Sequence, residues 1–134
     1  MDELTGGCAC GAVRYGTATP SLMMNCHCRD CQKASGAACA ALVIVPRQST
    51  TIRGELRFHE VQGESGHPVR RGFCPICGSQ VAAEIGALPD VIAIQAGSLD
   101  DPSEYKPSME IWTTSAQPWI QMLGETEKRP HGLR

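Results

Sequence analysis

The sequence predicts a small, mainly β domain whose short strands depend on bound metal for stability, and four observations support this prediction. The chain has 134 residues, a length that suits one domain. Aromatic residues make up only 4% of it, so aliphatic side chains must form most of the core. The 14 glycines and 9 prolines indicate many turns, and the 8 cysteines offer the cross-links that a thin core needs.

Short apolar or alternating runs, separated by turn residues, are predicted to be strands. These runs are residues 12–15, 22–25, 40–45, 56–59, 69–73, 81–84, 91–96 and 109–113. Glycine and proline lie between them, as at Gly86 and Pro89. No internal repeat or long linker interrupts the pattern, so we expect a single domain over residues 1–124.

Two short segments are predicted to be helical. Residues 29–34 can form one or two turns, which Gly36 would end. A second short helical piece is expected over residues 118–123. The polar stretch 125–134 is expected to be a frayed tail outside the domain.

Charge and hydropathy argue against two classes of partner. The net charge of −2 does not favour nucleic-acid binding, which needs a basic surface. No apolar stretch reaches the roughly 20 residues needed to span a membrane.

The first residues lack a basic segment followed by an apolar run, so we expect a cytoplasmic protein. Because thiols stay reduced there, disulfides are the less favoured explanation of the cysteines.

Seven of the cysteines fall into three short clusters, namely Cys8 and Cys10, then Cys26, Cys28 and Cys31, and finally Cys74 and Cys77. In a strand, the two thiols of a C-x-C point to one face and can reach the same ion. In a C-x-x-C the chain turns tightly, and here Pro75 and Gly78 suit that turn. Zinc prefers soft, tetrahedral thiolate ligation of this kind.

The ligand count predicts two different zinc sites. Cys8, Cys10, Cys74 and Cys77 supply the four ligands of a closed, structural site. Cys26, Cys28 and Cys31 supply only three, which is typical of a catalytic zinc with an open position. Two residues could close that position. His27 would point the other way in an extended segment, and Cys39 lies in an apolar run, where cysteine is more often a small core residue.

Four motifs carry a resemblance to a known family. They are GGCACGAVRY at 6–15, NCHCRDCQKASG at 25–36, GFCPICGSQV at 72–81, and EIW at 110–112 with the later PW at 118–119. In this order they resemble the glutathione-dependent formaldehyde-activating enzyme (GFA) family, whose domain is shared with centromere protein V. The cysteine clusters carry most of the specificity.

The resemblance implies a fold of coiled β-sheets with two zincs. The first C-x-C and the last C-x-x-C would form the structural site, and the C-x-C-x-x-C would form the catalytic site. The family's named reaction joins glutathione to formaldehyde, giving S-hydroxymethylglutathione; its reverse is carbon–sulfur lysis. Family members often carry histidine where this chain has Glu110, a difference that bears on the substrate.

Three thiolates around Zn²⁺ leave a net charge of −1, which makes the metal a weak Lewis acid and favours an incoming thiolate over water. We therefore expect a zinc-dependent carbon–sulfur lyase that acts on a glutathione-type thiol and formaldehyde or a related small carbonyl. The alternative is a non-catalytic zinc module that binds a protein partner or carries a small thiol; metal storage or sensing is a third hypothesis. The sequence leaves the oligomeric state open.

Charged and aromatic residues near the motifs could contact a substrate, but a surface or core position is the favoured interpretation of each. Arg14, Arg29 and Lys33 could hold substrate carboxylates, but solvated surface positions are the favoured interpretation. The pair at 70–71 is also expected to be solvated. Trp112 and Trp119 are expected in the core or at its rim.

Overall fold

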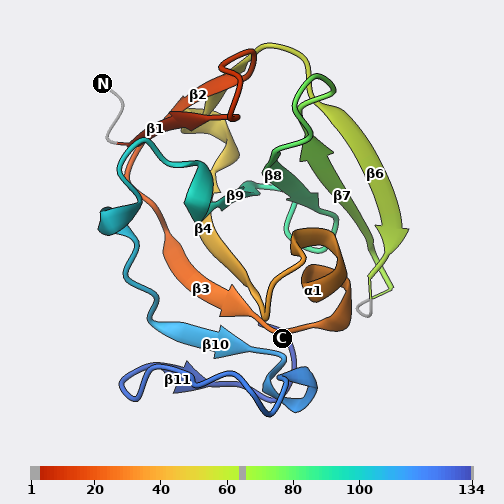
Figure 1. Cartoon of the computed structure of the whole chain (residues 1–134), viewed down its shortest axis with the longest axis vertical. Coiled ribbons are helices and arrows are strands. Elements are labelled where there is room, and N and C mark those ends of the chain that lie inside the picture. The colour runs from red at the N-terminus through yellow and green to blue at the C-terminus, as the bar shows by residue number, and fades with distance from the viewer. Residues whose placement is uncertain (1–3, 64–65, 134) are drawn as a thin grey trace.

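The computed structural model describes residues 4–63 and 66–133, and it contains two sheets, one helix and four 3₁₀ turns within them (Figure 1). The smaller sheet has the order β1 (Leu4–Gly7), β2 (Arg14–Thr17), β5 (Thr51–Arg53). The larger has the order β11 (Glu127–Lys128), β10 (Met109–Ile111), β3 (Leu22–Cys26), β4 (Ala40–Pro46), β9 (Val91–Gln95), β8 (Gln80–Ile85), β7 (Pro68–Phe73), β6 (Arg57–Gln62). The helical elements are α1 (Arg29–Ser35), η1 (Arg47–Ser49), η2 (Ala96–Ser98), η3 (Pro102–Glu104) and η4 (Thr113–Ser115).

The mainly β fold is confirmed, and each of the eight predicted runs overlaps a strand. Pairing is antiparallel except where β10 lies parallel to β3 and to β11. Three strands were not predicted, because β1 is half glycine, β5 has only three residues and β11 is polar. Such segments join a sheet through main-chain hydrogen bonds, which leave little trace in side-chain pattern.

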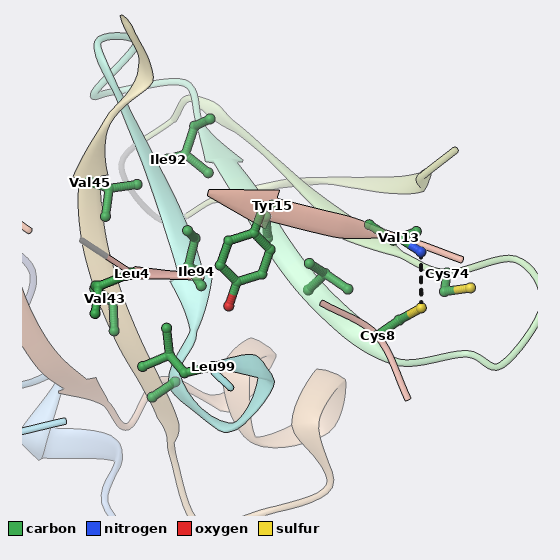
Figure 2. Close-up of a cluster of buried hydrophobic side chains, with 13 residues drawn as sticks. Leu4, Cys8, Val13, Tyr15, Val43, Val45, Cys74, Ile92, Ile94 and Leu99 are labelled. Atoms are coloured by element: carbon green, nitrogen blue, oxygen red, sulfur yellow. Dashed lines mark hydrogen bonds between the residues drawn. The ribbon is translucent and has the colours of Figure 1, made fainter. Parts of the chain in front are cut away.

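The large sheet separates two cores, and each core contains cysteines of one group. Along β4, Val43 and Val45 face the first core while Leu42 and Ile44 face the second, as the two-residue period of a strand requires. Figure 2 shows the first core, where the aliphatic side chains surround Tyr15 and extend to Cys8 and Cys74. The second core contains Cys26 and Cys31.

The large sheet curves from β10 and β3 round to β7 and β6, and α1 lies between its two ends (Figure 1). The predicted helix at 29–34 is confirmed as α1. Cys28 caps its first turn, since its sulfur accepts a hydrogen bond from the backbone N–H of Cys31. Gly36 ends it in the left-handed conformation, at φ 72°, which costs glycine little.

The predicted helix at 118–123 is wrong. These residues form only a turn at 118–119, and the nearest helical element is η4. The side chain of Trp119 is 70% exposed and Leu123 is 47% exposed. A helix this short is stable only when an apolar face packs against the domain, and these side chains do not pack.

The expectation of a frayed tail is also wrong. Strand β11 pairs with β10, and further along the chain the backbone N–H of Trp112 donates to the carbonyl of His131 at 2.9 Å. Leu133 packs against the second core. The polar composition concealed this packing, because most of the contacts are made by the main chain. The boundary at residue 124 stays a prediction.

Within the described ranges, the structure has no helix with the length and apolarity needed to cross a bilayer.

Candidate metal centres

The first candidate centre is the four-cysteine cluster, made of Cys8, Cys10, Cys74 and Cys77, whose sulfurs all lie within 4.8 Å of one another. Sγ of Cys10 lies 3.6 Å from that of Cys8 and 3.7 Å from that of Cys74. A tetrahedral zinc with Zn–S bonds of about 2.3 Å would hold its sulfurs about 3.8 Å apart. The four thiols therefore have the spacing that a tetrahedral metal site requires.

Two tight turns hold these thiols in place. In the first, the backbone N–H of Val13 donates to the sulfur of Cys8 at 3.2 Å (Figure 2). In the second, Gly78 takes a φ of 79°, as its predicted role requires, and its N–H donates to the carbonyl of Cys74 at 2.8 Å. Each turn thus presents its sulfurs from a backbone fixed by hydrogen bonds.

Cys8 and Cys10 do not have the expected geometry of two thiols on one face of a strand, although their sulfurs do lie close together. Strand β1 ends at Gly7, and residues 9–10 form a turn, so Cys8 and Cys10 are not on one face of a strand. Gly11, at a φ of 84°, completes this turn. Both pairs of cysteines therefore lie in tight turns, a geometry that was predicted only for Cys74 and Cys77.

Ser79 joins the two turns. Its hydroxyl accepts a hydrogen bond from the backbone N–H of Ala9 at 3.0 Å and lies 3.2 Å from the sulfur of Cys77. Hydrogen bonds from the side chain and backbone of Ser79 lower the pKa of Cys77 to about 5. A thiol with a lowered pKa gives up its proton to a metal more easily.

The second candidate centre is the three-cysteine cluster of Cys26, Cys28 and Cys31, whose sulfurs also lie within 4.8 Å of one another. Cys26 ends β3, Cys28 is the N-cap of α1, and Cys31 lies in its first turn. The backbone N–H of Cys31 donates to the sulfur of Cys28 at 3.3 Å. The cluster therefore sits where a strand passes directly into a helix.

The thiols of this cluster share their hydrogen bonds unequally. Hydrogen bonds from Cys26 and Cys28, and a further one from Arg71, lower the pKa of Cys31 to about 3. Hydrogen bonds to Cys28 and Cys31, together with burial, raise the pKa of Cys26. A second thiolate beside the first is unfavourable unless a cation compensates its charge. A soft divalent metal ion would supply the positive charge that three converging thiolates need.

His27 belongs to neither cluster, as its predicted orientation requires. Its side chain is 1% exposed, and its Nε2 lies 2.7 Å from a carboxylate oxygen of Glu110, also 1% exposed. Asn25 donates to the same carboxylate at 3.1 Å. Glu110 thus binds the side chains of Asn25 and His27, the two residues on either side of Cys26. It does not line the cavity described below.

Cys39 lies outside both clusters and is half-buried just before β4. Replacing it with alanine should leave both metals bound and cost at most a few kcal/mol, as a packing change. Metal analysis of the purified variant, alongside its thermal unfolding, checks this expectation. Loss of one equivalent of metal would instead make Cys39 the fourth ligand of the three-cysteine cluster.

The three-cysteine cluster opens on a cavity of about 360 Å³. The cavity lies on the second-core face of the large sheet, between the strands, the start of α1 and the C-terminal residues. Its size is within the range of ligand pockets, about 300 to 1,000 Å³. A molecule bound there would lie directly beside the three sulfurs.

Arg71 is the cation that sequence reasoning missed. It lines this cavity, and its Nη2 lies 3.5 Å from the sulfur of Cys31. Its neighbour Arg70 instead pairs with Glu84 and stacks over the Phe58 ring at 4.3 Å. Alternation along β7 could have revealed this difference, because it places the two arginines on opposite faces of the sheet.

The three cations considered from the sequence lie elsewhere. Arg14 pairs with Asp100 at 2.5 Å, and the guanidinium holds the pKa of that carboxyl at about 2. Arg29 donates to Gln32 within α1, and Lys33 is exposed. None of the three lines the cavity. Trp112 does line it, whereas Trp119 is exposed.

These features define a class: a small β domain with one complete group of four thiols and one group of three that opens on a cavity. The chain belongs to the glutathione-dependent formaldehyde-activating enzyme family, whose sequence model matches residues 3–115. The resemblance is thereby confirmed. The fold is similar to the crystal structure of a Rhodobacter sphaeroides protein, with a TM-score of 0.56, 19% identity, and coverage of 72% of this chain and 87% of that chain. At this identity the likeness supports the fold alone.

Proposed function

We propose that the chain is a zinc-dependent enzyme that makes or breaks the carbon–sulfur bond of a thiol adduct at Cys26, Cys28 and Cys31. The observation that carries this proposal is the contrast between the two clusters. Within the described residues, four thiols surround one position, but only three converge at the other, which faces a cavity. A site with three protein ligands leaves room for a substrate atom, whereas four ligands close it.

In this proposal each chain holds two zinc ions, one per cluster. Cys8, Cys10, Cys74 and Cys77 hold the structural ion, and Cys26, Cys28 and Cys31 hold the catalytic one. When bound there, zinc supplies a soft, electrophilic centre that keeps an incoming sulfur deprotonated near neutral pH. The eight cysteines are free thiols in the structure, so the seven in the two clusters are available to bind metal. The proposal places the chain in the cytoplasm, where thiols stay reduced.

The reaction adds a thiol to an aldehyde. The thiolate sulfur attacks the carbonyl carbon and forms a C–S bond, while the C=O π pair moves to oxygen. That oxygen then takes a proton from water. Lysis is the reverse of these steps. The family description makes glutathione the first thiol to test and formaldehyde the first carbonyl. The Arg71 guanidinium, beside Cys31, would hold an oxygen that gains negative charge.

A cobalt-substituted protein would test thiol binding directly, because a fourth thiolate changes the visible absorption bands of cobalt. We expect glutathione to shift those bands at millimolar concentration or below. S-methylglutathione, whose sulfur cannot ionise, is the matched control and should shift them much less. Reductant must be removed first, since dithiothreitol is itself a thiol ligand.

Two results would contradict this expectation. If both compounds shift the bands equally, the sulfur is not what anchors the ligand. If neither does at millimolar concentration, glutathione is the wrong thiol. Catalysis is then tested separately, by asking whether the loaded protein forms or breaks the formaldehyde adduct faster than buffer does.

A further inference from the structure

The cavity beside the three-cysteine cluster has mostly apolar walls. Its aliphatic side chains come from six consecutive strands of the large sheet, from β10 to β7, and from the residues after β8, among them Met24, Leu42, Val69, Ile85 and Leu88. Of these, Met24 is 2% exposed and Leu42 is 7% exposed, so the walls belong to the second core. Apart from the cysteines, the ionisable residues lining it in the described part of the chain are Asp30, Arg71 and His131, and only Arg71 is not exposed.

Two small residues account for the free space. Ala83 on β8 and Ala93 on β9 lie directly opposite each other in the register of these strands, and both line the cavity. Ala83 is 8% exposed and Ala93 is 1% exposed, so neither is a surface residue. On the other face of the same strands, Val81 and Ile94 fill the first core. Side chains therefore fill the space on one face of the sheet, whereas the other face borders the cavity.

The C-terminal residues cover part of this space. Leu133 packs on the second core, and the Trp112 ring meets that of His131 edge to face, with centroids 5.3 Å apart. Trp112 takes a left-handed conformation, at φ 57°, that is unusual for so large a side chain. The wall on this side is therefore held by specific contacts.

The size and polarity of the cavity do not match a hydroxymethyl group. An engineered apolar cavity of about 150 Å³ is large enough for benzene. A cavity of 360 Å³ is more than twice that size. The peptide part of glutathione carries two carboxylates and an amine, and burying unpaired charges among aliphatic side chains is unfavourable. One arginine at the cluster does not neutralise them.

We propose that this cavity binds an apolar substituent, about as large as a phenyl ring or a short alkyl chain, on the carbonyl component of the adduct. The proposal rests on the function proposed above, since it assumes that the adduct's sulfur lies at the three-cysteine cluster. In this arrangement the carbon next to the sulfur lies at the cavity's entrance and its substituent points inward. The polar part of the thiol stays outside, within reach of Arg71. The substrate class is then an aromatic or medium-chain aldehyde.

The test compares stable mimics of two adducts by calorimetric titration of the zinc-loaded protein. S-benzylglutathione represents the adduct of an aromatic aldehyde, and S-methylglutathione represents that of formaldehyde. Burial of the phenyl ring should make the first bind about 10- to 100-fold more tightly. Ala83→Leu and Ala93→Leu fill the cavity and should remove most of this advantage. Ala37→Leu, at an exposed position outside the cavity, is the matched control and should keep it.

Thermal unfolding and zinc content establish that each variant is folded and loaded, and Ala83→Val supplies a milder filling if leucine disrupts the core. Equal affinity of wild type for the two mimics would overturn the inference. So would an advantage of S-benzylglutathione that survives in both leucine variants, because the ring would then bind elsewhere.

Toluene, which has no sulfur, separates this inference from the proposed function. If wild type binds toluene and the filled variants do not, while glutathione still shifts the cobalt bands, both stand. If toluene does not bind, the cavity does not accept apolar groups and the inference is wrong, whatever glutathione does. If toluene binds but neither glutathione nor either mimic does, the assignment to a thiol adduct is overturned together with the proposed function.

Discussion

Replacing Cys77 with serine is expected to leave the chain largely unfolded at room temperature. Zinc binding contributes about 10 to 16 kcal/mol to the folding of zinc-finger peptides, comparable to or larger than the 5 to 15 kcal/mol that stabilises a typical domain. The four-cysteine cluster brings the end of β1 beside the segment between β7 and β8, so a metal held there would tie the small sheet to the large one. Circular dichroism and thermal unfolding of the variant measure the effect.

The position of Cys77 makes this a clean test of metal binding. Its side chain is exposed, so substitution removes no packing. Ile76→Ser changes the neighbouring residue, 76% exposed, and is the matched control, which should unfold like wild type. Chelator should destabilise wild type and the control but have little further effect on Cys77→Ser. A variant as stable as wild type would show that the four-cysteine cluster does not support the fold.

Replacing Cys28 with serine should have the opposite result: a folded protein without activity. Cys28 caps α1 through its sulfur, and serine is one of the best N-cap residues, so the helix should keep its start. Removing one of three ligands from the proposed catalytic zinc should lower the rate of adduct formation or lysis by at least about 100-fold. The comparison is of initial rates for wild type and variant, each corrected for the reaction in buffer.

The same variant separates the enzyme from a purely structural zinc module. If Cys28→Ser unfolds as Cys77→Ser is expected to, then the three-cysteine cluster is structural and the enzyme proposal is weakened. A folded Cys28→Ser variant that keeps the full rate would place the chemistry elsewhere. Arg71→Lys is a useful companion, because it keeps the charge beside Cys31 but loses the planar guanidinium.

The features that the sequence predicted well are those determined by a few adjacent residues. Helix α1 and its end at Gly36 follow from one short segment, and Gly78 adopts the positive φ that the turn after Cys74 requires. The strand runs were found because period-two patterns mark half-buried strands. Grouping of the cysteines followed from their spacing, although the turn at Cys8 and Cys10 did not.

The features that were missed depend on contacts between distant segments. Strand β11 joins the sheet through main-chain hydrogen bonds to β10, which polar residues make as readily as apolar ones. The cavity exists because strand register places Ala83 opposite Ala93, a pairing that no local pattern specifies. The buried pair of His27 and Glu110 joins residues 83 positions apart. Arg71 alone could have been found, from alternation along its strand.

The measurement that tests the central claim most directly is the zinc content of the purified, reduced protein, prepared without chelator and related to the number of free thiols. Two clusters of thiols predict between one and two zinc ions per chain. Any shortfall from two should come from the three-cysteine cluster, which has one ligand fewer, and Cys28→Ser should then contain about one zinc. A folded, reduced protein with zinc content near zero would contradict the account.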